Sequence, residues 1–337
     1  MRVDGQLWIV SAVTEIPAGR QALTIAIERG AVGAEQATKS GVRSLPEAGL
    51  GQTREDLALA AGSKALAAAG IEGSDVGLVI YSWTLDTNTD WKIAQRLSRQ
   101  LGATHAVAVG LRQLCNGGAA GLHFAAAQLL TEPRLRHALV LTADALGPDA
   151  GRFWLMDEVG AAMGDAGTGL LLSRGGGALA VLSIASAARS DQEAWLPQND
   201  RVPEISAGGD ESQSVSAVIF VRRHGVRAAV DAALVDADLD PRDPDVAVVA
   251  LPRLANDVTG ALTDGMVRGR RPRRIVHLAE EGHLFAGDLT ANVEHLLQHE
   301  MLAPGERALI INIGAGFTVT CVVVQAPGAP GGGKEGT

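Results

Sequence analysis

Helical sequence patterns alternate with short apolar segments along almost the whole chain. Candidate amphipathic or apolar helices cover residues 54–69, 89–101, 117–130, 226–235, 255–267 and 289–302. Candidate buried strands cover residues 76–81, 106–111, 138–142, 170–173, 246–250, 274–278, 308–312 and 318–324. Such alternation is typical of layered α/β folds. The sequence therefore predicts an α/β architecture.

Two local matches indicate that the second half of the chain repeats the first. The segment SDV at 74–76 resembles PDV at 244–246, and a glycine turn plus strand from 164 resembles a glycine turn plus strand from 314. The alternative is chance similarity between short buried strands. We expect two homologous halves, at 1–175 and 176–326. A Gly/Pro-rich tail at 327–337 is expected to be disordered, and the polar segment 192–214 is expected to form a loop.

Composition excludes several classes of protein. The 337 residues contain two cysteines, too few for a disulfide framework or a four-cysteine zinc site. The net charge of −9 argues against a general nucleic-acid binder. The sequence shows neither a signal-peptide pattern nor an apolar run of the length that spans a membrane. We expect a cytoplasmic protein with reduced thiols and no membrane partner.

Cys115 is the first candidate for chemistry. It lies between a predicted strand and a predicted apolar helix, and Gly117 and Gly118 follow it. The positive end of a helix dipole favours a thiolate, which can accept an acyl group from a thioester. The alternative is a structural cysteine that behaves as a small apolar residue. Cys321 lies within a valine-rich strand and is expected to pack in the core.

His283 is the second candidate, because an imidazole on a loop after Gly282 can serve as a general base. The alternative is a helix-capping or surface histidine. His295 and His299 are spaced i, i+4 on a helix, but no further pattern supports a metal site there. We expect no metal ion and no bound cofactor.

Several motifs together resemble the thiolase superfamily, and within it β-ketoacyl-acyl-carrier-protein synthase III. The matching segments are KSGVR at 39–43, DLA at 56–58, MGDAG at 163–167, LPRLAN at 251–256, GH at 282–283, PGE at 304–306 and GAGFT at 314–318. The resemblance covers about residues 5–325. It implies two similar halves in a five-layer α/β/α/β/α arrangement, a homodimer, and Cys115 as an acyl-accepting nucleophile.

The departures from this family carry the most information. Synthases of the family use a Cys-His-Asn triad, in which His and Asn stabilise the enolate formed by decarboxylation. Here Arg253 stands at the His position and His283 at the Asn position. Thiolases place a Gly-His pair at this second position, which can therefore hold a base. A Cys115–His283 dyad is suited to acyl transfer but lacks the pair expected for decarboxylative condensation.

The resemblance therefore predicts an acyltransferase of natural-product, polyketide-type biosynthesis. An acyl group would pass from an acyl carrier protein or coenzyme A phosphopantetheine thioester, through Cys115, to a small hydroxyl or amine acceptor. The backbone N–H of Cys115 and the Gly316 region would form the oxyanion hole. The alternatives are a decarboxylative condensing enzyme with a non-standard triad and a catalytically silent subunit of a heteromeric synthase.

The resemblance also implies supporting roles for several other residues. Arg253 would bind a carboxylated acyl group or acceptor, or form an internal ion pair, and Asn256 follows it in the same motif. Asp288 would orient the base or cap the following helix. Glu35 stands where relatives stack a Trp on adenine, which weakens the case for coenzyme A. The basic run would dock an acidic carrier, and it comprises Arg268, Arg270, Arg271, Arg273 and Arg274.

Overall fold

Ten strands form one mixed sheet that is built from two sets with the same internal order. The computed structural model describes residues 1–85, 90–148, 151–152, 160–190, 215–240, 242, 245–263, 272–315 and 317–328. The first set is β1 (Arg2–Glu15), β4 (Val76–Ser82), β5 (Val107–Leu111), β6 (His137–Asp144) and β7 (Ala166–Ser173). The second set is β8 (Leu179–Ala188), β9 (Val246–Ala250), β10 (Arg274–Val276), β11 (Arg307–Gly314) and β12 (Thr318–Gln325).

The order of the strands shows the duplication directly. The sheet runs β10-β9-β11-β12-β8-β1-β7-β6-β4-β5, and the antiparallel pair β1–β8 joins the two sets. Moving outward from this junction, each set contains two antiparallel pairings followed by two parallel pairings. The predicted fold of two similar α/β halves is therefore confirmed, whereas the exact boundaries of the halves stay a prediction.

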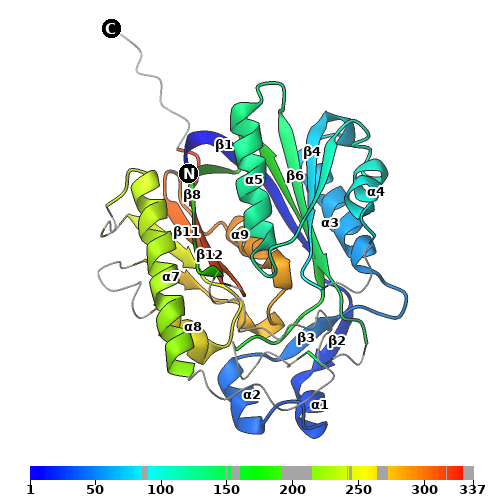
Figure 1. Cartoon of the computed structure of the whole chain (residues 1–337), viewed down its shortest axis with the longest axis vertical. Coiled ribbons are helices and arrows are strands. Elements are labelled where there is room, and N and C mark those ends of the chain that lie inside the picture. The colour runs from blue at the N-terminus through cyan, green and yellow to red at the C-terminus, as the bar shows by residue number, and fades with distance from the viewer. Residues whose placement is uncertain are drawn as a thin grey trace.

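The helices and the two strand sets are stacked in layers. On one outer face, α3 (Arg54–Ala69) and α4 (Ile93–Gln100) share an apolar core with the first set. On the other outer face, α7 (Val215–Asp236) packs on β8 and β12, with α8 (Asn256–Thr263) beside it. Between them, α5 (Gly117–Thr131) and α9 (Asp288–Gln298) share one core with strands of both sets. Figure 1 shows this order of layers, from α7 through α5 and α9 to α3 and α4.

The central helix α5 lies close to its neighbours because its first turn lacks side chains. A Cβ atom on Gly117 would lie 2.1 Å from the Ser82 hydroxyl, and one on Gly118 would lie 2.3 Å from the Ala286 carbonyl oxygen. Both distances are shorter than any real contact of a Cβ atom, so these positions require glycine. The close approach brings the N-terminus of α5, and the residues just before it, into the middle of the molecule.

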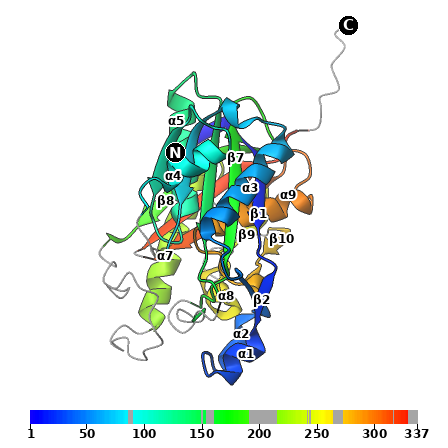
Figure 2. The same cartoon turned by 90° about the vertical axis from the view of Figure 1, so that its right-hand side faces the viewer.

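Four short elements form a separate unit at one end of the sheet. These are β2 (Gly19–Ala22), α1 (Leu23–Glu28), α2 (Ala34–Ser40) and β3 (Ser44–Glu47). The strands β2 and β3 pair with each other and not with the large sheet. Figures 1 and 2 show this unit, including α1, α2 and β2, at the same end of the molecule from both directions.

Several predicted elements need correction. The glycine turn predicted before one strand is partly strand itself, since β7 already begins at Ala166. The helix predicted at 226–235 is longer, because α7 begins at Val215, and α9 ends at Gln298 although the prediction extended it to residue 302. The predicted loop at 192–214 and most of the tail at 327–337 lie outside the described residues. Across the described residues, no helix combines the length and apolar character needed to cross a bilayer.

Candidate active site

Cys115 lies in a tight turn between β5 and α5, and only 8% of its surface is exposed. Asn116 is the N-cap of α5, so Cys115 immediately precedes the helix. The preceding residue, Leu114, has φ +48°, and its carbonyl oxygen accepts from Gly117 N–H at 2.9 Å. A left-handed conformation in a non-glycine residue costs about 1–3 kcal/mol and is kept only where the surroundings enforce it. The turn is therefore a strained feature that places one cysteine in front of a buried helix N-terminus.

Buried polar groups from the second strand set hold this turn in place. The Asn312 side chain on β11 donates from Nδ2 to the Cys115 carbonyl oxygen at 3.0 Å and to Asn116 Oδ1 at 3.3 Å. Asn116 donates in turn to the Thr320 hydroxyl on β12 at 3.0 Å, and Ser186 on β8 contacts the same hydroxyl at 2.9 Å. A connected set of buried hydrogen bonds fixes the groups that it joins. The backbone of Cys115 is thus fixed by strands that lie far from it in the sequence.

His283 lies on the loop between η3 (Ala279–Glu281) and η4 (Phe285–Gly287), with 3% of its surface exposed. Its N–H donates to the Ala162 carbonyl oxygen at 2.7 Å, and its own carbonyl accepts from Gly164 at 3.0 Å. Gly282 has φ +73°, and a Cβ atom there would lie 2.4 Å from the Ala162 carbonyl oxygen. Gly282 is therefore needed for the loop to run this close to the 160–164 segment.

The imidazole of His283 interacts with two partners. Its Nδ1 contacts Asp288 Oδ2 at 2.6 Å, and Cys115 lies close enough to the ring to influence its pKa. Burial by itself lowers the pKa of His283. The charges and hydrogen bonds of Asp288 and Cys115 outweigh burial and raise that pKa well above its ordinary value. A cysteine, an imidazole and a carboxylate thus follow one another in a single line of contacts.

Asp288 is the first residue of α9 and is completely buried, at 0% exposure. Its Oδ2 accepts from His283 and from Arg253 N–H at 3.0 Å, and its Oδ1 accepts from Leu284 N–H at 2.8 Å. Burial raises the pKa of Asp288, but the charge and hydrogen bond of His283 reverse this effect and leave the pKa below its usual value. The helix-capping alternative is wrong, because the N-cap of α9 is Gly287 and the carboxylate faces His283.

Arg253 does not join the Cys115–His283 centre through its side chain. Its backbone N–H supports Asp288, while its guanidinium is 3.5 Å from Glu281 Oε2 and lines a separate pocket. The internal ion pair is thus the arrangement that the structure shows. Asn256 is exposed and lies against Gly41, where a Cβ atom would be 2.4 Å from its Nδ2. The structure therefore does not bring Asn256 to the centre.

The remaining sequence candidates separate into three groups. Gly316, Arg268, Arg270 and Arg271 lie outside the described residues. Arg273 and Arg274 are exposed beside the edge strand β10, and the Arg273 guanidinium binds the Glu306 carboxylate. Cys321 is buried on β12 in the core, as expected.

The histidine pair on α9 shows no metal-ligating arrangement. The rings of His295 and His299 lie 4.1 Å apart, between their centroids. Within the part of the chain that the structure describes, no group of three or more His, Cys, Asp or Glu side chains is placed to hold a metal ion.

Two contributors to the site were missed by the sequence patterns, namely Asn312 and Asn116. The one available signal for Asn312 was a single amide within the apolar strand ALIIN. A buried amide must find hydrogen-bond partners, so an isolated asparagine in such a strand indicates a nearby polar group. The sequence did not show that this group is the backbone of Cys115.

The geometry supports a defined type of chemistry. A nucleophile contacts a base, and a buried carboxylate orients the base through its second nitrogen. A charged imidazole beside a cysteine favours the reactive thiolate. The same imidazole can later accept a proton from an incoming hydroxyl or amine. Such an arrangement is chemically suited to covalent group transfer in two steps without a second imidazole.

Comparison with known proteins agrees with the fold and with this class of site. No family model matches the chain. The curated relatives include β-ketoacyl-[acyl-carrier-protein] synthase III of Streptomyces glaucescens, 26% identical over 313 residues that cover 86% of this chain and 87% of that protein. The same enzyme of Paramagnetospirillum magneticum is 27% identical over 297 residues, covering 85% and 88%.

Solved structures resemble the chain over nearly its whole length. The acyltransferase ChlB3 superposes with a TM-score of 0.81 at 24% identity and covers 96% of this chain and 98% of its own. FabH, the 3-oxoacyl-(acyl carrier protein) synthase III of Pseudomonas aeruginosa, gives 0.77 at 21% identity, covering 95% and 98%. The tetronic acid condensing enzyme AbyA1 gives 0.74 at 21% identity, covering 95% and 100%.

The fold and the buried cysteine centre together define a thiolase-fold protein. Within that class, the chain is a divergent relative of β-ketoacyl-[acyl-carrier-protein] synthase III.

Proposed function

We propose that this protein is an acyltransferase that moves an acyl group from a thioester, through Cys115, to a hydroxyl or amine acceptor in natural-product biosynthesis. The observation that carries the proposal is the line of contacts from Cys115 to His283 to Asp288, with the Arg253 guanidinium turned away from it. Decarboxylative condensation needs two groups that stabilise an enolate. In this site Arg253 stands at the position of the second group and pairs its guanidinium with Glu281, while Asp288 only orients His283.

The first half-reaction acylates the enzyme. The Cys115 thiolate attacks the thioester carbonyl carbon, and a tetrahedral oxyanion forms. The backbone N–H of Cys115 and the Gly316 region would donate to this oxyanion, each at about 3 kcal/mol. The intermediate collapses, the donor sulfur leaves, and the His283 imidazolium gives it a proton. The products are an acyl-Cys115 thioester and a free thiol.

The second half-reaction transfers the acyl group. The acceptor hydroxyl or amine attacks the acyl-Cys115 carbonyl while neutral His283 takes its proton. Collapse of the second intermediate releases the ester or amide and restores the thiolate–imidazolium pair. Asp288 keeps the Nδ1 proton of His283 in place throughout, so Nε2 remains the nitrogen that faces the reaction.

The carrier and the assembly are also part of the proposal. We favour an acyl carrier protein over free coenzyme A as donor, because Arg274 presents an exposed basic side chain for an acidic partner, next to the exposed Arg273–Glu306 ion pair. We also propose a homodimer through β5. This edge strand pairs with β4 on one side, and the nearby apolar residues Val107 and Phe124 are 66% and 44% exposed.

Intact-mass spectrometry after incubation with acyl carrier thioesters and acyl-coenzyme A tests the proposal. The wild type should gain the mass of one acyl group, and Cys115→Ala should gain none. Cys321→Ala is the matched control, since it removes a buried thiol outside the site, and it should acylate normally. Absence of an adduct across a broad donor panel would refute any acyl-enzyme mechanism.

Two further measurements separate the alternatives. Added acceptor should discharge the acyl-enzyme of the wild type, and His283→Ala should discharge more slowly by about 10²–10⁴-fold, the usual contribution of a general base. Release of carbon dioxide from a malonyl donor, together with a new carbon–carbon bond, would instead identify a condensing enzyme. A protein that forms no adduct but changes the products of a partner synthase would be a silent subunit.

A further inference from the structure

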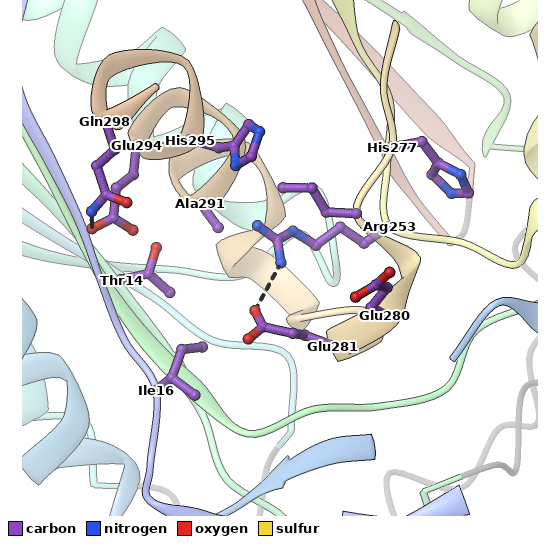
Figure 3. Close-up of a pocket in the computed structure, with 11 residues that line it drawn as sticks. Thr14, Ile16, Arg253, His277, Glu280, Glu281, Ala291, Glu294, His295 and Gln298 are labelled. Carbon is purple, nitrogen blue, oxygen red and sulfur yellow. Dashed lines mark hydrogen bonds and ion pairs between the residues drawn. The ribbon is translucent and has the colours of Figure 1, made fainter. Parts of the chain in front are cut away.

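A polar pocket lies beside Arg253 and is not lined by Cys115. It has a volume of about 470 Å³ and lies between the end of β1, the η3 segment and α9. We call it the outer pocket. Its walls include Thr14, Arg253, Glu281, Glu294, His295 and Gln298, whereas Cys115, His283 and Asp288 do not line it. Figure 3 shows the Arg253 guanidinium pointing into its centre, between His295 and Glu281.

Arg253 is a buried cation with unused hydrogen-bonding capacity. Its side chain is 5% exposed, and its buried Nε has no hydrogen-bond partner. The nearest carboxylate, Glu281, is 3.5 Å from its NH1 group and also lies 3.8 Å from Arg20. A buried guanidinium normally binds a carboxylate through two parallel hydrogen bonds. The geometry therefore leaves room on Arg253 for the carboxylate of a ligand.

Glu294 supplies the opposite charge on another wall of the same pocket. Its carboxylate accepts from Gln298 Nε2 at 2.9 Å, and burial raises its pKa above the ordinary value although hydrogen bonding with Thr14 and the charge of Arg253 act in the other direction. Among the residues that the structure describes, no Lys or Arg forms an ion pair with Glu294. The neighbouring His277 and His295 have pKa values lowered by burial, so they add no positive charge at neutral pH. Glu294 is a partly desolvated anion that a ligand cation would stabilise.

These charges select one class of ligand. A simple carboxylate would meet Arg253 but would add a negative charge beside Glu280, Glu281 and Glu294. A simple amine would meet Glu294 but would leave the Arg253 guanidinium with Glu281, at 3.5 Å, as its one ion-pair partner among the described residues. A molecule that carries both groups satisfies both walls and adds no net charge. We propose that the outer pocket binds a small amino acid, with its carboxylate on Arg253 and its ammonium group on Glu294.

Calorimetric titration of the full-length protein tests this inference. The probes are glycine, β-alanine and 4-aminobutyrate, which separate the two charges by increasing lengths, together with propionate and propylamine as single-charge controls. At least one amino acid should bind, and both single-charge probes should bind at least about tenfold more weakly. Equal binding of propionate would mean a plain anion site, and equal binding of propylamine a plain cation site; either result overturns the proposal.

Matched variants locate the binding. Glu294→Gln should weaken the best probe at least about tenfold, whereas Glu300→Gln, at an exposed position just after α9, should bind it unchanged. Cys115→Ala should also bind it unchanged, because the outer pocket does not include the sulfur. This last variant separates the inference from the proposed acyl transfer. Absence of heat with all three amino acids at about 10 mM, in a wild type that still acylates, would refute the outer-pocket site alone.

Discussion

Replacing Asp288 with asparagine exchanges one carboxylate oxygen for an NH2 group and leaves the shape of the side chain unchanged. In the wild type, Oδ2 accepts from both the His283 Nδ1–H and the Arg253 N–H, and Oδ1 accepts from the Leu284 N–H. An asparagine offers one oxygen and one NH2 group for these three donors. In either orientation of the amide, at least one buried donor faces another donor. We therefore expect Asp288→Asn to lower the free energy of unfolding by about 1–3 kcal/mol.

The larger effect of Asp288→Asn falls on acylation. If the NH2 group faces His283, Nδ1 must become an acceptor, and the ring proton moves to Nε2, the nitrogen that should receive a proton from Cys115. The negative charge that holds the pKa of His283 above its ordinary value is lost as well, and burial then lowers that pKa. By analogy with the buried aspartate of serine proteases, we expect a loss of about 10³–10⁴-fold in rate. At 1.36 kcal/mol per tenfold change, this corresponds to about 4–5 kcal/mol.

A time course of acyl-enzyme formation at several pH values measures this effect. In the wild type, the thiolate–imidazolium pair should keep acylation fast at neutral pH. In Asp288→Asn, acylation should require alkaline pH, where a thiol ionises without help. Asp144→Asn is the matched control, since it neutralises another fully buried carboxylate, which accepts backbone N–H bonds from Thr84 and Leu85. Wild-type acylation with an unchanged pH profile in Asp288→Asn would refute the assignment of this carboxylate.

Three further variants test buried polar groups, the first of them in the site and the other two elsewhere in the fold. Asn312→Leu leaves the Cys115 carbonyl without its donor, so denaturant titration should show a loss of about 1–3 kcal/mol, and intact-mass kinetics should show acylation slowed by at least about tenfold. Burial raises the pKa of Asp144 to about 7, so the folded protein holds a proton that the unfolded chain releases. Its contribution to the unfolding free energy should fall by up to about 4 kcal/mol as pH rises from 4 to 7, and urea titrations should show this dependence vanish in Asp144→Asn. In the wild type, Arg152 Nη1 lies 2.7 Å from Oδ1 of the fully buried Asp165, and Arg152→Met removes this charged partner. Urea titrations should show the free energy of unfolding reduced by about 3–5 kcal/mol, and an unchanged midpoint would contradict this.

Elements with local start and stop signals could be predicted from the sequence. The bounds of α3 agree with the prediction because Thr53 and Asp56 form a capping box and Gly70, at φ +63°, ends the helix. The strand β1 was missed, since Asp4 and Gly5 interrupt its pattern near the start. Its extended conformation is stabilised by β7 and β8, which come more than 150 residues later. Pairing over such separations leaves little trace in a local pattern.

The same contrast applies to the site. Cys115 and His283 stood out because glycines beside them indicated unusual backbone conformations. The role of Asp288 stayed open, since a residue before a helix suits either capping or orientation, and the choice depends on where the loop with His283 runs. Asn312 was missed because its partner lies 197 residues away along the chain. The direction of the Arg253 side chain follows from the position of its backbone. That position is fixed by the hydrogen bond from Arg253 N–H to Asp288 on α9, which the sequence around Arg253 does not show.

The division of the site between the two strand sets has a consequence for synthesis of the chain. Cys115 emerges from the ribosome with the first half, but its base, its orienting carboxylate and the amide that holds its backbone follow at residues 283, 288 and 312, and the last buried support at Thr320. Since domains fold as their residues become available, the nascent chain carries an ordinary thiol for most of its translation. Under the proposed mechanism, the protein would become able to react with thioesters only when almost the last strand has been made, so truncated chains would not take acyl groups from their carriers.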